Sequence, residues 1–275
     1  MRFQLAAFAD EADSRLDGQI AAMRGNGIAY LEIRGVDGQN IADISLEKAA
    51  AIRKRLEEAG LAVWSLGSPY GKIGIREAFA PHLESFRRGL ELAAVLGCSH
   101  IRLFSFYIPE GEPAASYRDA VMERLEQFRT AAQGSGVILC HENEKGIYGD
   151  TAARCADIHR TFPDIRAVFD PANFIQCGQE IPAAWEELAP YVEYMHIKDA
   201  LADGTVVPAG KGIGRLPWLL QRYAGRVLTL EPHLAVFSGL DKLEQAEHQT
   251  EMTACRYASS EEAFRAAADA LKALL

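Results

Sequence analysis

The stretch Val137–Asn143, V-I-L-C-H-E-N, is an apolar run that ends on a potential metal ligand, Glu142. Three later stretches repeat this design, each ending on a carboxylate or an imidazole: R-A-V-F-D-P-A-N with Asp170, Y-M-H-I-K-D-A with His196, and V-L-T-L-E-P-H with Glu231. The four side chains are 28, 26 and 35 residues apart, about the length of one strand plus one helix. In a barrel of parallel strands the C-terminal strand ends meet at one mouth, so this spacing predicts that the four side chains converge.

Eight short runs along the chain are candidates for strands. Most are nearly continuous in hydrophobic residues, as expected of parallel strands that are buried on both faces. The runs are Phe3–Phe8, Tyr30–Arg34, Ala62–Gly67, His100–Phe106, Val137–Asn143, Arg166–Phe169, Tyr194–Lys198 and Val227–Glu231. Amphipathic stretches separate them, so the sequence predicts a (β/α)8 TIM barrel, with a parallel eight-stranded barrel and a C-terminal helix. One domain over residues 1–275 fits the usual length of such a barrel.

The stretches between these runs carry residues that are typical of helix starts and helix ends. The predicted helices include Ser45–Ala59, whose S-L-E-K start resembles a capped helix, and Arg76–Leu96, Tyr117–Gln133 and Ser260–Leu275. A glycine followed by an apolar residue closes four helical stretches, at Gly27, Gly60, Gly97 and Gly136, because glycine readily takes the left-handed conformation that ends a helix. An open doubly wound sheet would need a glycine-rich phosphate loop after the first strand, but F-A-D-E-A-D follows it.

Composition narrows the classes of partner. The net charge of -9 disfavours a nucleic-acid partner, since such proteins usually present a basic face. The five cysteines are odd in number and form no C-x-x-C pair, which indicates reduced thiols. The first ten residues lack the pattern of a targeting segment, and no stretch has the roughly 20 apolar residues needed to span a bilayer. We therefore expect a cytoplasmic protein with no membrane partner.

The four strand-end side chains define a specific kind of metal site. Three carboxylates and one imidazole form a mixed oxygen and nitrogen ligand set, which suits one divalent ion such as Mn2+, Mg2+, Zn2+ or Co2+. The sequence does not choose among these four ions. A calcium site lined only by oxygen is disfavoured by His196.

The motifs H-E-N-E, D-P-A-N, H-I-K-D and L-E-P-H resemble the xylose isomerase-like superfamily of sugar (phosphate) isomerases and epimerases. The resemblance extends over nearly the whole chain, including S-P-Y-G-K and R-L-F-S-F-Y after the third and fourth runs. It implies that Glu142, Asp170, His196 and Glu231 are the metal ligands, and that Glu142 and Glu231 are also the acid/base pair. It further implies a small sugar-like substrate and, because many such relatives are oligomeric, a homo-oligomer.

The chemistry that this resemblance implies needs those residue types. Epimerising or isomerising a sugar beside its carbonyl requires removal of a weakly acidic C–H proton. A divalent ion that holds the carbonyl and hydroxyl oxygens stabilises the resulting enediolate. Two glutamates on opposite sides of the substrate can then remove and return the proton in turn.

Other polar residues near the strand ends are candidates for binding substrate. Lys198 should share the side of its strand with His196, where it could neutralise an oxyanion or pair with Asp199 or another acid. His233 could bind a substrate hydroxyl, or lie in a loop outside the site. Either Glu32 or Arg34 should face the mouth, and Lys72 either meets an acidic or phosphorylated group or is solvated. The remaining candidates, Asn173 and His141, would support the ligands or make turn and cap hydrogen bonds.

Four other functions are compatible with this fold or with some of these residues. An endonuclease IV-like enzyme would need additional histidines, but Asn173 stands where that pattern has histidine. Ketose 3-epimerases carry a glutamate and an arginine where this chain has Tyr148 and Ala202, so the metal core matches but the substrate-orienting residues do not. An inosose-type dehydratase or isomerase on the same metal is the principal alternative, and a non-catalytic metal- or sugar-binding module is a further one. The charged segment 234–259 could cover the site, form a subunit contact or be a solvated insertion.

Overall fold

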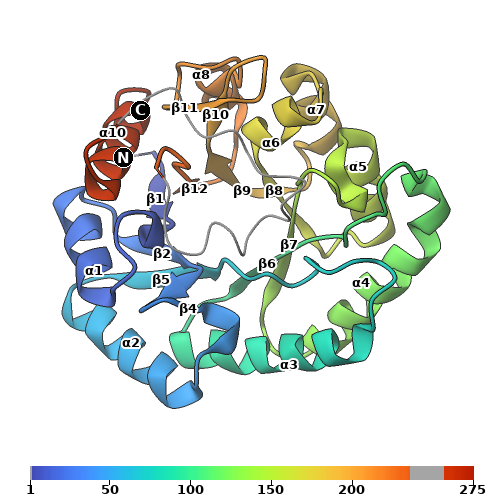
Figure 1. Ribbon diagram of the computed structural model, residues 1–275, viewed down its shortest axis with the longest axis horizontal. Helices are drawn as coiled ribbons and strands as arrows, with labels where there is room; N and C mark the ends of the chain where they lie inside the picture. The colour runs from blue at the N-terminus through green and yellow to red at the C-terminus, as the bar shows by residue number, and fades with distance from the viewer. Residues whose placement is uncertain (1, 236–256) are drawn as a thin grey trace.

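Eight parallel strands close into a barrel at the centre of the computed structural model, which describes residues 2–235 and 257–275 (Figure 1). The barrel strands are β1 (Gln4–Ala7), β2 (Tyr30–Ile33), β5 (Ala62–Leu66), β6 (His100–Leu103), β7 (Ile138–Glu142), β8 (Arg166–Phe169), β9 (Val192–Ile197) and β12 (Val227–Leu230). Their order is that of the sequence, and β12 pairs with β1 to close the barrel. The predicted (β/α)8 barrel is confirmed.

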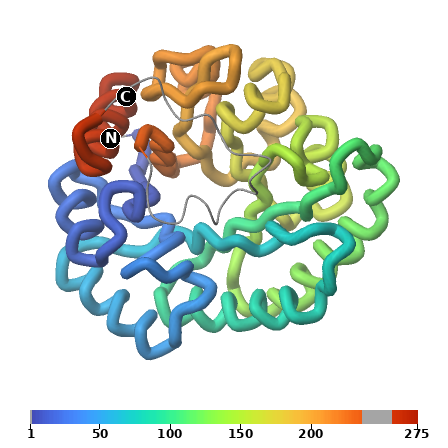
Figure 2. Tube along the Cα trace, in the orientation of Figure 1, coloured from blue at the N-terminus to red at the C-terminus, as the bar shows by residue number. Residues whose placement is uncertain are grey.

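Helices surround this barrel on its outside (Figures 1 and 2). They are α1 (Leu16–Gly25), α2 (Leu46–Glu58), α3 (Phe79–Leu96), α4 (Arg118–Ala132), α5 (Ala152–Thr161), α6 (Pro171–Gln176), α7 (Ile181–Leu188), α8 (Leu216–Arg222) and α10 (Ser260–Lys272). The C-terminal helix α10 packs against α1 and β12, so the two ends of the chain meet in the ring. Among the described residues, no helix has both the length and the hydrophobicity that crossing a bilayer requires.

Local sequence signals explain most helix ends. Ser45 caps α2 as predicted, because its hydroxyl accepts the N–H of Lys48. All four glycines that the sequence placed at helix ends have positive φ, and Gly97 (φ 73°) is the C-cap of α3. Helix α3 begins at Phe79 rather than at Arg76, because the residues before it form a turn in which Glu77 accepts the N–H of Gly74.

The ends of two strands shape the mouth: the end of β6 differs from the prediction, and that of β8 agrees with it. Strand β6 ends at Leu103 rather than at Phe106, whose φ of 66° turns the chain away from the barrel. Strand β8 ends at Phe169, and Asp170 becomes the N-cap of α6 by accepting the N–H of Asn173. Two short hairpins add to this end: β3 (Gly35–Val36) with β4 (Gln39–Asn40), and β10 (Asp199–Ala200) with β11 (Val206–Val207).

Hydrophobic side chains fill part of the barrel interior, whereas the mouth at the C-terminal strand ends is polar. Cys140, Val168 and Tyr194 form a buried cluster inside the barrel, and Trp64 packs against it, so Trp64 is a core residue. The four described cysteines form no disulfide, in line with the expected reduced thiols. The segment 234–259 lies outside the described residues over 236–256, and its predicted role stays a prediction.

Candidate metal centre

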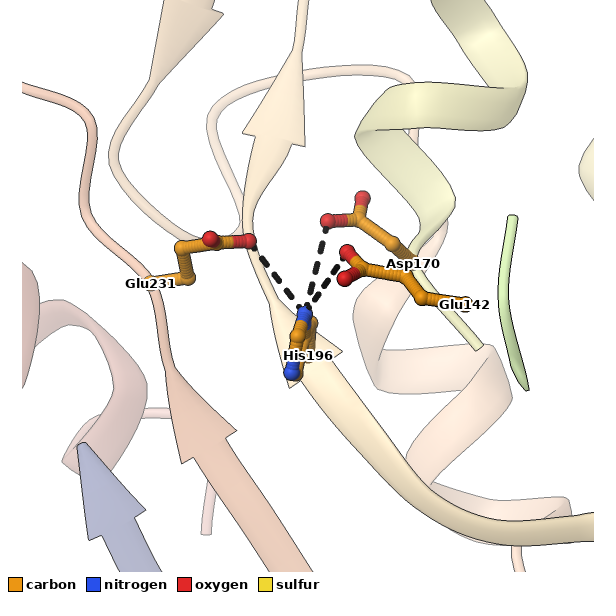
Figure 3. Close-up of side chains that lie close together, drawn as sticks. All are labelled: Glu142, Asp170, His196 and Glu231. Atoms are coloured by element: carbon orange, nitrogen blue, oxygen red, sulfur yellow. Dashed lines mark hydrogen bonds and ion pairs between the residues drawn. The ribbon is translucent and has the colours of Figure 1, made fainter. Parts of the chain in front are cut away.

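The four predicted ligands meet at the C-terminal mouth of the barrel. Glu142 ends β7, Asp170 follows β8, His196 lies near the end of β9, and Glu231 follows β12. All four are buried, and one ligand atom from each lies within 4.8 Å of the others. Figure 3 shows Glu231 on one side of the His196 ring, and Asp170 and Glu142 on the other.

The imidazole of His196 is the centre of this group. Its Nδ1 lies 2.9 Å from Glu142 Oε1, 3.3 Å from Glu231 Oε2 and 4.0 Å from Asp170 Oδ2. Its other nitrogen, Nε2, lies 3.0 Å from Oε2 of the fully buried Glu32. Burial alone would raise the pKa of Glu32, but His196 and Arg102 outweigh it and lower the pKa, so Glu32 is a carboxylate that accepts the Nε2–H. This contact orients the ring so that Nδ1 faces the three other carboxylates.

The charges of the carboxylates raise the pKa values of their neighbours. Burial would lower the pKa of His196, but Glu142, Glu32 and Glu231 raise it well above its ordinary value. Burial together with Glu231 and Glu142, against the opposing effect of Lys198, raises the pKa of Asp170 to about 7. Three clustered carboxylates and one imidazole nitrogen form a mixed oxygen and nitrogen donor set, which could hold one divalent ion.

Lys198 lies beside these carboxylates, as the strand alternation predicted. Its ammonium is 2.9 Å from Asp170 Oδ2 and 3.1 Å from Glu231 Oε2, so its partners are these two acids and not Asp199. Burial would lower its pKa, but Asp170, Glu231 and Glu142 raise it well above the usual value, and Lys198 stays charged. Asp199 points away, where its carboxylate accepts four backbone N–H groups: those of Ala200, Gly210, Gly212 and Gly214.

Arg34 is the member of the Glu32/Arg34 pair that lines the mouth. It holds Asp10 through two bonds of 2.9 and 3.1 Å, and it also contacts Glu11 at 3.2 Å and Glu231 at 3.3 Å. Burial raises the pKa of Glu11 to about 8, despite the opposing charge of Arg34. Arg34, which is itself held by Asp10 and Glu11, therefore helps to fix the position of the Glu231 carboxylate.

His233 also reaches the site. Its backbone takes a φ of 45°, which is uncommon outside glycine, and its N–H donates to Glu11 Oε2 over 2.6 Å. Its Nε2 lies 3.5 Å from Glu11 Oε1 and 3.7 Å from Glu231 Oε1. The structure thus places the ring next to a proposed ligand, within the lining of the mouth.

Asn173 and His141 lie in different environments. Asn173 is inside the site: its Nδ2 donates to Glu142 Oε1 over 3.3 Å and to the carbonyl of Asn143 over 2.9 Å. His141 points to the opposite face of β7, because neighbouring strand residues alternate, and its Nε2 lies 3.0 Å from Ser105 Oγ. The prediction that His141 contacts substrate is therefore corrected: its ring packs outside the barrel interior.

Among the further residues of the site, Arg102 was not predicted, whereas Glu32 and Lys72 were candidates from the sequence. Arg102, on β6, is buried, and its Nη1 lies 3.1 Å from Glu142 Oε2. Glu32, on β2, contacts Nε2 of His196, the ring nitrogen that faces away from the other three carboxylates. Lys72, which could have been solvated, is partly buried and lies 3.0 Å from Glu144 Oε2. The mouth is lined by Arg34, Lys72, Arg102, Glu142, Glu144, Asn173, Lys198, Glu231 and His233, which leave a cavity of about 10 Å³, room for about one water molecule. A substrate can enter only if some of these side chains move.

Known proteins share the family and the fold of this chain. The sequence matches the family model described as xylose isomerase-like TIM barrel over residues 20–235. No curated protein matches the chain in sequence. Solved structures that share the fold do so at low identity, and their likeness shows the fold alone.

Three of these structures show that proteins with different names share this fold. The IOLI protein with a bound zinc atom has a TM-score of 0.73 and 14% identity, over 98% of this chain and 97% of that one. D-psicose 3-epimerase with D-tagatose, from Clostridium cellulolyticum H10, has a TM-score of 0.74 and 13% identity, over 98% of each chain. The probable 3-DHS dehydratase AsbF from Bacillus anthracis, involved in petrobactin synthesis, has a TM-score of 0.72 and 16% identity, over 99% of each chain.

Proposed function

This chain belongs to the xylose isomerase-like TIM barrel family, and on that premise we propose that it is a divalent-metal-dependent isomerase or epimerase of a sugar or sugar derivative. The observation that supports this most directly is the set of Glu142, Asp170 and Glu231 around Nδ1 of His196. Epimerases among the structures of the same fold support the same class of reaction.

The two glutamates would carry the proton transfers. Glu142 and Glu231 approach His196 from opposite sides, so a substrate between them would meet one carboxylate on each face (Figure 3). One carboxylate oxygen takes the proton from the carbon beside the carbonyl, and the other glutamate returns a proton to give the product. When bound, the divalent ion would supply the positive charge that stabilises the substrate oxygens as they become negative.

Neighbouring side chains would hold these groups in place. Lys198 Nζ can donate a hydrogen bond to the same developing oxyanion, since it already lies within 3.1 Å of both Asp170 and Glu231. Asn173 orients Glu142, and Arg34 orients Glu231. The fully buried position of His196 keeps water away from the reacting carbon.

A dehydratase on the same site is the second candidate. Tyr148, at the position where ketose 3-epimerases carry a glutamate, donates its hydroxyl to Asp157 over 2.7 Å, and Ala202 is exposed. Neither of these positions can orient a ketose in the way those enzymes do. Lys198 or a protonated glutamate could instead assist the departure of a hydroxyl group β to the carbonyl, and the fold neighbour named a probable dehydratase agrees with this alternative.

The test is proton exchange in D2O. Ketoses, aldoses, inososes and their phosphates are incubated with the Mn2+-loaded protein and followed by NMR, with an EDTA-treated sample as control. We expect metal-dependent exchange of one carbon-bound proton, and the product then separates an epimerase from an isomerase or a dehydratase. Glu142→Gln and Glu231→Gln should each reduce exchange by about 100-fold or more. Wild-type turnover in both variants, with metal bound, would refute the assigned roles.

A further inference from the structure

We propose that Arg102 binds the substrate directly and that the substrate therefore carries a carboxylate or a phosphate group. This inference rests on the proposed function, because it names the substrate class of the same site. Two observations support it: the buried Nε of Arg102 has no hydrogen-bond partner among the described residues, and its guanidinium lies over the rings of Phe8 and Phe104.

The two arginines of the mouth differ in how they use their N–H groups. Arg34 makes aligned hydrogen bonds to Asp10, Glu11 and Glu231, as a structural arginine does. Arg102 is equally buried, at 3% exposure, yet among the described residues its guanidinium has only ion pairs with Glu142 and Glu231, at 3.1 and 3.9 Å from Nη1. Its Nε is buried without a hydrogen-bond partner among the described residues. Buried donors are nearly always satisfied, so a ligand is the expected partner of this edge.

Aromatic rings hold the guanidinium of Arg102 in place. Its Cζ lies 5.0 Å from the ring centroid of Phe8 and 5.0 Å from that of Phe104. These contacts stabilise the cation without using any N–H group, and they fix the plane of the guanidinium. A fixed guanidinium plane matches the two oxygens of a carboxylate or a phosphate, whereas a single hydroxyl would satisfy only one donor.

A second cation lies over the same ring. Lys72 Nζ is 4.4 Å from the centroid of Phe104. Its loop packs tightly on the segment after β6, because a side chain at Gly71 (φ 91°) would collide with the backbone of Phe104, and Phe104 N–H donates to Tyr70 O over 2.8 Å. Both cations line the cavity, so an anionic group near Phe104 would face Arg102 and Lys72 together.

The position of Arg102 also fits the proposed reaction. Its Nη1 contacts the carboxylate of Glu142, one of the two proposed proton carriers. An anionic group on the Nε edge would therefore lie beside the reacting end of the substrate and fix its orientation. An arginine that served only to neutralise Glu142 would affect the metal site, but it would not make the protein prefer anionic over neutral ligands.

Matched ligands test this distinction. Binding of D-glucuronate against D-glucuronamide, and of D-ribulose 5-phosphate against D-ribulose, is measured by calorimetry on the Mn2+-loaded protein. We expect one anion to bind about 10- to 100-fold more tightly than its neutral counterpart, and the pair that shows this separates carboxylate from phosphate. Arg102→Gln should remove the preference, which is measured as the ratio of the affinities of the same variant for the anion and for its neutral counterpart. The matched control is Arg226→Gln, an exposed arginine just before β12, at the other end of the barrel.

Each outcome decides the inference. Equal binding of anion and neutral analogue by the wild type, including no binding of any of the four at about 10 mM, overturns it. A preference that survives Arg102→Gln also overturns it. If Arg102→Gln does not fold, Arg102→Lys keeps the charge and loses the two-pronged contact, and it should lose most of the preference. Failure of the wild type to bind Mn2+ would instead refute the proposed function.

Discussion

Glu32 and His196 meet in the interior of the barrel, with Glu32 Oε2 3.0 Å from Nε2 of His196, although they are 164 residues apart in the chain. Tyr194 donates its hydroxyl to the other oxygen of Glu32 over 2.7 Å, so the carboxylate is held from two sides. This chain of contacts fixes the orientation of the His196 ring and turns its Nδ1 toward Glu142 and Glu231.

The first prediction concerns this contact. Glu32→Gln removes the charge that fixes His196, and we expect the affinity for Mn2+ or Zn2+ to fall by about 10- to 100-fold. Isothermal titration calorimetry measures this loss. The control is Tyr194→Phe, which removes only the outer hydrogen bond to Glu32 and should weaken metal binding less. Wild-type affinity in Glu32→Gln would mean that the Glu32 carboxylate does not orient the ligand.

The second prediction concerns Asp170. Asp170→Asn keeps an oxygen that can cap α6 but removes a ligand charge, so metal affinity should fall on the order of 100-fold. The pKa of Asp170 is raised from 3.8 to about 7, so its ionised form opposes folding. This penalty is absent below pH 3.8, builds up as the pH rises to about 7, and is complete above it.

In EDTA, Asp170→Asn should therefore unfold at a higher urea concentration than the wild type at pH 8, and at a similar one near pH 4. Unfolding curves at the two pH values measure the difference. If the variant is less stable than the wild type at pH 8, Lys198 stabilises the ionised form of Asp170 more than burial and the neighbouring acids oppose it.

The sequence could predict that Glu142, Asp170, His196 and Glu231 converge, because each ends an apolar run and parallel strands in a barrel end at one mouth. It could not place Glu32 or Arg102 so well. The two-residue alternation shows that His100 and Arg102 share a face of β6, but not that this face points inward. A charged residue within a fully buried strand was the signal that could have identified Arg102.

Contacts made by loops were harder still to predict. Lys72 and Glu144 come from the loops after β5 and β7, and only the closed barrel brings these loops together. The alternation after His196 correctly placed Lys198, but not its partners. Asp199 points the other way, and Lys198 pairs with other acids, which is one of the alternatives that the sequence left open.

The third prediction concerns that aspartate. Asp199 accepts the N–H groups of Gly210, Gly212 and Gly214, which anchors the loop between β11 and α8. Asp199→Ala should destabilise the protein by about 3 kcal/mol, because these donors lose a charged acceptor. Asp199→Asn keeps one acceptor oxygen and should lose less.

Limited trypsin digestion measures the same effect locally. Cleavage after Lys211 should become faster in Asp199→Ala than in the wild type, with Asp199→Asn in between. Unchanged cleavage in Asp199→Ala would show that the glycine loop is held by other contacts.

The last prediction concerns His159, a buried histidine of α5 that is remote from the metal centre. Its Nδ1–H donates to the carbonyl of Ile165 over 2.9 Å, and its ring stacks on Tyr191. Burial lowers its pKa from 6.5 to about 4, so the native protein resists the proton that the unfolded chain accepts. Stability is therefore complete above pH 6.5 and is lost as the pH falls to about 4, by roughly 3 kcal/mol from this group.

A comparison of wild type with His159→Gln isolates this contribution. Gln can still donate to Ile165 but cannot be protonated, so the variant lacks the acid-dependent part of the loss. Urea unfolding from pH 7 to pH 4 should therefore show the stability advantage of the wild type shrinking by roughly 3 kcal/mol over that interval. A difference between the two proteins that stays constant with pH would mean that His159 is protonated in the native state as readily as in the unfolded chain.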